Sequence, residues 1–192
     1  MWIAGGRLEM GALADRAGLS RATLYRWVGS RERLLGEVLW TFAAAAWDDA
    51  LARARGRGAD RISDAVARYL RGSLAFPPVR HFIESDPESA LRVIASKHTP
   101  FQGRSVDAMR ALLAAEAQSG AFVPALDLDA LAYLIVRIGE SFMFSDIVSG
   151  REPDIEHAVD AIHIVLHAPP AARRRRAAPS GTSGRPARRS SG

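Results

Sequence analysis

Apolar residues recur at intervals of three and four along nearly all of residues 10–168. No stretch alternates apolar and polar residues with a period of two over the length of a strand. Capping residues divide the pattern into helices. Ser20 precedes residues 21–28, Ser30 precedes residues 31 to about 54, and Asp60 begins a segment that ends near Phe76. The pattern therefore predicts an all-α fold.

Further helix starts are marked by proline. Asp86-Pro87 and Thr99-Pro100 each place a capping side chain before a proline at the first helical position. Asp127 precedes a strongly apolar helix expected to end near Gly150, and Glu152-Pro153 precedes a last helix over residues 154–167. From residue 169 onward the chain is arginine, alanine, proline, serine and glycine with nothing large to bury, which predicts disorder.

The net charge of +5 is unevenly distributed along the 192 residues. Residues 1–40 carry six arginines against four acids, and residues 41–168 carry thirteen cations against seventeen acids. Residues 169–192 carry seven arginines and no acid. A protein that coats nucleic acid along its whole length would not have a mildly acidic middle, so the basic balance belongs to the tail.

Several classes of function are excluded or disfavoured. The absence of cysteine excludes disulfides, thiolate nucleophiles and cysteine-bound zinc. No P-loop, GxGxxG or ordered Ser/His/Asp set is present, so we expect neither an enzyme nor a cofactor. No apolar run approaches the roughly 18 residues of a membrane helix, and residues 1–6 lack the features of a signal peptide. We therefore expect a cytoplasmic protein with no membrane partner.

Histidines give no convincing metal site in the sequence. His81 and Glu84 are three residues apart, a spacing common on solvated helices. His157, His163 and His167 lie on the predicted last helix without acidic partners at ligand spacing, which favours an interface or surface role. We expect no metal.

The stretch from Ala12 to Leu35 predicts a helix-turn-helix. Gly18-Leu19 forms the turn, and Ser20 caps the second helix. The first turn of such a recognition helix faces base edges in the major groove, while hydroxyl, indole and guanidinium groups bind phosphates. An ordinary helical hairpin with a solvated arginine face is the alternative. The candidate DNA-binding residues are Ser20, Arg21, Ala22, Thr23, Tyr25, Arg26, Trp27 and Arg31.

This stretch resembles the TetR/AcrR family of bacterial regulators. The run AGLSRATLYRWV at 17–28, followed by SRERLL at 30–35, is similar to the family signature. Arg31 stands where the family usually has lysine, and Val28 where it usually has phenylalanine. The resemblance implies a DNA-binding domain over residues 1–40 and a helical effector-binding and dimerisation domain over residues 41–168. It also implies that Arg21 and Ala22 lie at base edges, with Thr23, Tyr25, Trp27 and Arg31 on the DNA backbone.

The family places a full amphipathic helix before the helix-turn-helix, whereas nine residues precede Met10 here. We expect either a start codon assigned too late or a DNA-binding domain without its first helix. In the second case Leu13, Leu24 and Leu34 lose a covering partner. The alternative function is then a helical ligand-binding and dimerisation module that has lost DNA binding.

A second and less specific resemblance is to the QsdR-type subgroup. Segments 76–80, 85–88, 90–93 and 136–142 carry it. Regulators of this subgroup are associated with the degradation of quorum-sensing lactones. This resemblance bears on the class of ligand alone.

The predicted helix after Asp127 has two opposite faces that are both expected to be turned away from solvent. One face holds a stripe in which Arg137 and Glu140, three residues apart, can pair. We expect the stripe to line a cavity in which Arg137 donates to the carbonyl of a largely apolar effector. Together with the QsdR-type resemblance, this implies a lactone with an acyl chain. A surface ion pair beside a partly exposed tyrosine is the alternative. The candidate effector residues are Phe82, Arg92, Phe101, Tyr133, Arg137, Glu140 and Phe144.

The opposite face, which includes Leu131, Ile135 and Gly139, is expected to join Ile162 and Leu166 of the last helix in a two-fold homodimer. Together these features predict a ligand-responsive transcriptional regulator, a repressor. It would bind palindromic double-stranded operator DNA as a homodimer and be released by a small-molecule effector.

Overall fold

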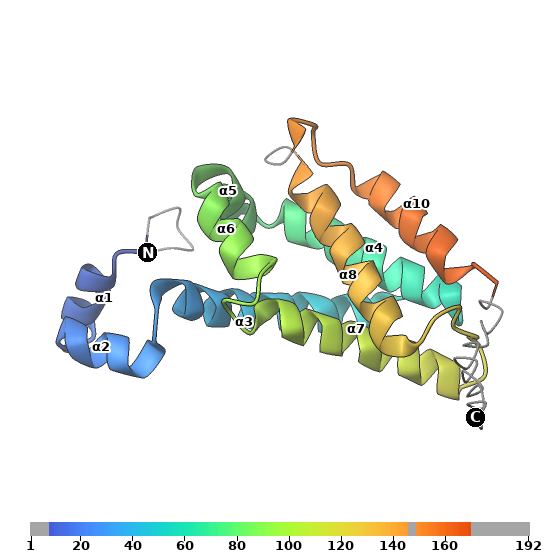
Figure 1. Cartoon of the computed structure of the whole chain (residues 1–192), viewed down its shortest axis with the longest axis horizontal. Coiled ribbons are helices and arrows are strands. Elements are labelled where there is room, and N and C mark those ends of the chain that lie inside the picture. Colours follow the sequence, from blue (N-terminus) through green and yellow to red (C-terminus); the bar gives the residue numbers. More distant parts are fainter. Residues whose placement is uncertain (1–7, 146–148, 170–192) are drawn as a thin grey trace, which may run out of the picture.

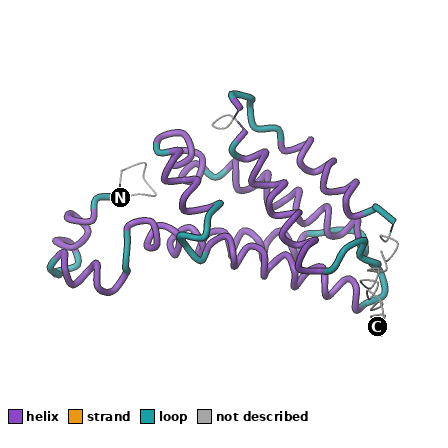
Figure 2. The backbone as a smooth tube through the Cα atoms, viewed as in Figure 1, coloured by secondary structure: helices purple, strands orange, loops and turns teal. Residues whose placement is uncertain are grey.

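The computed structural model describes residues 8–145 and 149–169 (Figure 1). Every regular element in these ranges is a helix, which confirms the all-α prediction (Figure 2). The helices are α1 (Met10–Arg16), α2 (Arg21–Val28), α3 (Arg31–Arg53), α4 (Ala59–Ala75), α5 (Pro77–Ser85), α6 (Pro87–Ile94), α7 (Phe101–Gln118), α8 (Leu128–Met143) and α10 (Ile155–Leu166).

The small pair α1 and α2 lies at one end of the molecule, and the long helix α3 runs from it beneath the others (Figure 1). Ala14 and Leu24 are buried between these first helices. Because α3 continues through residue 40, the expected domain boundary falls inside a helix rather than in a linker.

The other end is a helical bundle in which α4 packs on α3 and α10, while α8 packs on α7 and α10. Its centre includes fully buried Ile62, Leu113, Leu131 and Ile162. Gly139 on α8 leaves room for the Leu70 side chain of α4, since a Cβ there would lie 3.1 Å from Leu70 Cδ2. The space above Gly139 is therefore filled by a side chain of the same chain and not by a second copy.

A buried glutamate fixes the connection between α3 and α4 onto α7. Glu116 accepts hydrogen bonds from the Gly58 amide at 2.8 Å and from Arg61 at 2.5 Å. Gly58 has a φ of +58°, and a side chain there would overlap the Ala121 carbonyl. Glycine is thus required both by the backbone conformation and by the space.

Most of the predicted helix starts agree with the structure. Ser20, Ser30, Asp86 and Asp127 each accept a hydrogen bond from the backbone amide three residues later. At the last helix the cap is Asp154, which accepts from the His157 amide. α10 therefore begins at Ile155, one residue after the predicted start at residue 154.

Two other helix boundaries differ from the prediction, and two terminal segments cannot be compared with it. α7 begins one residue after Pro100, because the Thr99 hydroxyl donates to the Val93 carbonyl at 2.6 Å and tightens the preceding turn. α8 ends at Met143, before the expected Gly150. The predicted tail at residues 170–192 and the segment at residues 1–7 lie outside the described residues.

Candidate functional site

The predicted recognition helix α2 is a capped helix with a largely exposed surface. The Ser20 hydroxyl accepts from the Thr23 amide at 3.1 Å, and Leu24 anchors the helix in the core. Tyr25 and Trp27 are 43% and 67% exposed, which is unusual for large aromatic side chains. Arg21, Ala22 and Arg26 are exposed as well. The surface thus offers hydrogen-bond donors at the start of the helix and aromatic groups beyond it.

Arg21 lies back over α1. A Cβ at Gly11 would overlap the Arg21 guanidinium, so the absence of a side chain at Gly11 makes room for it. The buried glycine therefore leaves room for a side chain that is expected at base edges.

Arg31, expected on the DNA backbone, is turned inward. Its guanidinium donates to the Leu8 carbonyl at 3.2 Å, to the Ser89 hydroxyl at 3.3 Å and to Asp86 at 3.3 Å. Burial alone raises the pKa of Asp86, but hydrogen bonds from Ser89 and Arg31 outweigh this and hold the pKa below its ordinary value. Arg31 thus connects the start of α3 to the start of α6, and its phosphate contact stays a prediction.

A cavity of about 670 Å³ lies in the bundle between α3, α4, α7 and α8. Its walls include aromatic side chains from several helices. Trp40 meets Phe101 edge to face with ring centroids 5.8 Å apart, and Trp47 meets Tyr69 in the same way at 5.5 Å. A volume of this size with aromatic walls is typical of small-molecule sites.

Glu140, which is buried, and Tyr69, which is partly buried, are titratable groups in the wall of this cavity. Glu140 is 8% exposed and accepts from Arg137 Nη1 at 2.5 Å. Burial raises the pKa of Glu140 to about 7, and the attraction of Arg137 only partly opposes this. Burial, together with nearby Glu140, also raises the pKa of Tyr69 above its ordinary value, although a hydrogen bond with Ser73 lowers it. Near neutral pH the wall can therefore present two proton donors.

The structure brings together two of the seven candidate effector residues at this cavity, Phe101 and Glu140. Arg137 is not among the lining residues; its side chain is half-exposed and donates to the Ala95 carbonyl at 3.1 Å. The other four lie elsewhere: Phe82 and Phe144 are buried outside the lining, Tyr133 is exposed, and Arg92 pairs with Glu88 at 3.8 Å.

The residues expected at the dimer interface require a correction. Leu131, Ile135, Ile162 and Leu166 are all buried in the core of their own chain. α8 packs on α7 and α10, and α10 also packs on α4. These four side chains are therefore not available to a second copy. The exposed apolar side chains on the same two helices are instead Tyr133 on α8 and Ile164 on α10.

Sequence reasoning missed most of the cavity wall. Trp40, Ala43 and Trp47 on α3 share one face at helical spacing, a pattern that is equally typical of a core. Tyr69 on α4 has no distinguishing neighbour in the sequence. Only the packing of four helices shows that these side chains surround a space.

The arrangement combines a helix-turn-helix with a helical bundle that encloses a cavity, an architecture of two-part regulators. The model for the family described as "Tetracyclin repressor-like, C-terminal domain" matches residues 57–167. This chain belongs to the TetR family of transcriptional regulators. No curated protein matches the sequence significantly.

Two solved structures are similar to this chain. The transcriptional repressor QsdR of R. erythropolis, from the TetR family, is 28% identical, with a TM-score of 0.80 over 86% of this chain and 88% of that chain. The TetR family regulator PfmR of Thermus thermophilus is 24% identical, with a TM-score of 0.43 over 83% and 87%. None of the helices in the described residues has the length and apolar character needed to cross a membrane.

Proposed function

We propose that this chain is a transcriptional repressor that binds a palindromic operator as a homodimer and is released by a small, largely apolar effector. In this proposal residues 1–40 bind DNA in the cytoplasm, and residues 41–168 bind the effector and dimerise. The TetR family supports regulated DNA binding, and the similarity to QsdR, described as a transcriptional repressor, supports repression.

The observation that carries the regulation is the position of α6. Its last residue, Ile94, lines the cavity, while Asp86 and Ser89 at its start bind Arg31 next to α2. An effector that displaces α6 therefore pulls on the start of α3. Because two recognition helices must match the spacing of half-sites on DNA, roughly 34 Å apart, a small displacement is enough to weaken operator binding.

The cavity favours an effector with an apolar body and a hydrogen-bond acceptor. Aromatic walls from Trp40, Trp47 and Phe101 suit the body, and the Tyr69 hydroxyl and protonated Glu140 can each donate to an acceptor. An acyl lactone, with a ring carbonyl and a hydrocarbon chain, has this chemistry. We assign the donor role to Tyr69 and Glu140 in preference to Arg137, which is not among the residues that line the cavity.

The homodimer is proposed through the outer faces of α8 and α10. Tyr133 lies near the start of α8 and Ile164 near the end of α10, and the two helices pack side by side (Figure 1). Two copies of this pair would form a four-helix interface.

The proposal is tested by fluorescence anisotropy with a labelled duplex from the region upstream of the gene, at fixed salt concentration. We expect tighter binding to this duplex than to a shuffled duplex of equal length, and release by acyl lactones but not by the hydrolysed acids. Equal affinity for both duplexes would favour a module without sequence-specific DNA binding. If the chain binds the upstream duplex sequence-specifically and no lactone releases it, lactones are excluded as the effector class. The proposal of a sequence-specific regulator would still hold.

A further inference from the structure

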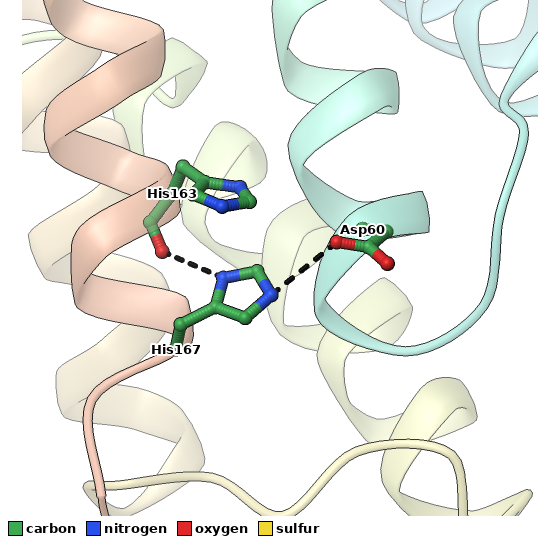
Figure 3. Close-up of side chains that lie close together, drawn as sticks. All are labelled: Asp60, His163 and His167. Atoms are coloured by element: carbon green, nitrogen blue, oxygen red, sulfur yellow. Dashed lines mark hydrogen bonds and ion pairs between the residues drawn. The ribbon is translucent and has the colours of Figure 1, made fainter.

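Three side chains with metal-binding chemistry meet where α10 ends and α4 begins (Figure 3). His163 and His167 are one turn apart on α10, and Asp60 lies in the first turn of α4. Their ligand atoms all lie within 4.8 Å of one another. About 100 residues separate Asp60 from the two histidines in the sequence, so only the packing of α4 on α10 reveals the group.

The hydrogen bonds of His167 determine which nitrogen faces Asp60. Nδ1 of His167 lies 2.9 Å from the His163 carbonyl oxygen, which can only accept, so Nδ1 carries the proton (Figure 3). In the neutral ring Nε2 then has a free lone pair, and it lies 3.3 Å from Oδ1 of Asp60. Two electron-pair donors facing each other at this distance can bind one cation between them.

His163 is arranged in a comparable way. Its Nδ1 lies 3.4 Å from the Ser63 hydroxyl, a partner that leaves Nε2 free to act as a ligand. The two imidazole rings lie against each other, with centroids 3.9 Å apart and planes inclined by 37°. Metal-binding histidines commonly have their second nitrogen held by a carbonyl, carboxylate or hydroxyl group in this manner.

We propose that Asp60, His163 and His167 form a binding site for one divalent transition-metal ion, Zn²⁺ before the others. Two imidazoles and one carboxylate match the ligand preference of Zn²⁺, whereas Ca²⁺ and Mg²⁺ prefer oxygen alone. Bonds of about 2.0–2.1 Å place ligand atoms roughly 3.3 Å apart, which rotations of these exposed side chains achieve. Solvent water completes the coordination.

The bound ion would tie the last turn of α10 to the first turn of α4. Ile164, at the proposed dimer surface, lies between the two histidines on α10. A fixed C-terminal turn would therefore hold this part of the surface in place. The site does not depend on the effector cavity or on DNA binding.

The test is isothermal titration of the full, untagged, chelator-treated chain with ZnCl₂, together with melting curves. We expect one Zn²⁺ per chain, a rise in Tm with Zn²⁺, and no binding of Mg²⁺. His163→Gln and His167→Gln should each weaken Zn²⁺ binding about tenfold or more. His157→Gln is the matched control, because His157 is an exposed histidine on the same helix that pairs with Asp154 instead.

Two outcomes would contradict the proposed Zn²⁺ site. The proposal is wrong if the wild-type chain shows no saturable Zn²⁺ binding. It is also wrong if the double variant with both His163→Gln and His167→Gln binds Zn²⁺ as tightly as the wild type does. The three side chains are exposed, so the metal-free variants should melt with the wild-type protein. If a histidine variant melts early, Asp60→Asn provides the second test, with the same expected loss of the Zn²⁺-dependent rise in Tm.

Discussion

Replacing Glu140 with glutamine removes a buried, titrating carboxyl from the cavity wall while keeping its shape. In the folded chain the pKa of Glu140 is raised from 4.5 to about 7, because burial disfavours the charged form. Between pH 4.5 and about pH 7, Glu140 of the folded chain therefore keeps a proton that it has released in the unfolded chain. The free energy of unfolding therefore falls as pH rises through this window.

The magnitude follows from the raised pKa. At 1.36 kcal/mol per pKa unit, a rise of the Glu140 pKa from 4.5 to about 7 corresponds to a loss of about 3 kcal/mol in the free energy of unfolding. This loss is absent below pH 4.5 and complete above pH 7. Glu140→Gln should remove this loss, since the amide resembles the protonated acid and still accepts from Arg137. We expect the variant to gain roughly 1–3 kcal/mol over the wild type at pH 8 and almost nothing at pH 4.5.

The assay is urea unfolding of both chains from pH 4.5 to 8.5 at one protein concentration, because dimerisation adds to apparent stability. Glu84→Gln is the control, since Glu84 is exposed and pairs with Arg80 within one helix. Its effect on the free energy of unfolding should be small, as is usual for an exposed ion pair. A difference between Glu140→Gln and wild type that is equal at pH 4.5 and pH 8 would refute the reasoning.

Three further changes test the DNA-binding surface, the dimer and the cavity. Arg21→Ala should weaken operator binding by about 1–3 kcal/mol and relax sequence preference in anisotropy titrations, and an unchanged preference would remove Arg21 from base recognition. Ile164→Glu should give a folded monomer by sedimentation, because Ile164 is 69% exposed, whereas Ile162→Glu should unfold the chain by burying a charge. A folded Ile164→Glu dimer would exclude this face. Tyr69→Phe should weaken release by lactones about tenfold with operator affinity intact, and an unchanged dose response would exclude Tyr69 as the donor.

The parts of the fold that could be predicted from the sequence are those set by local interactions. Ser20, Ser30 and Asp127 cap helices through amides three residues away, so their effect is visible in a short window. Leu24 and Trp27 likewise follow from the spacing within α2, one buried and one exposed.

The parts that could not be predicted depend on which helix faces meet. α8 has apolar residues around most of its circumference, so the sequence does not show that Leu131 and Ile135 pack inside the chain and that Tyr133 faces outward. The pairing of Arg137 with Glu140 is a local prediction, and the structure confirms it. The inward turn of Arg31 is not local, because its partners, Asp86 and Ser89, are more than 50 residues away.

The central claim is that two copies of α2 read one operator. A hydroxyl-radical footprint of the chain on the DNA upstream of its gene tests this most directly. The account predicts two protected patches of related sequence whose centres are one helical turn, about 10–10.5 base pairs, or a multiple of it apart. At the same protein concentration, Arg21→Ala should weaken the protection of both patches together. Uniform protection along the fragment, or none at concentrations where the chain is dimeric, would contradict it.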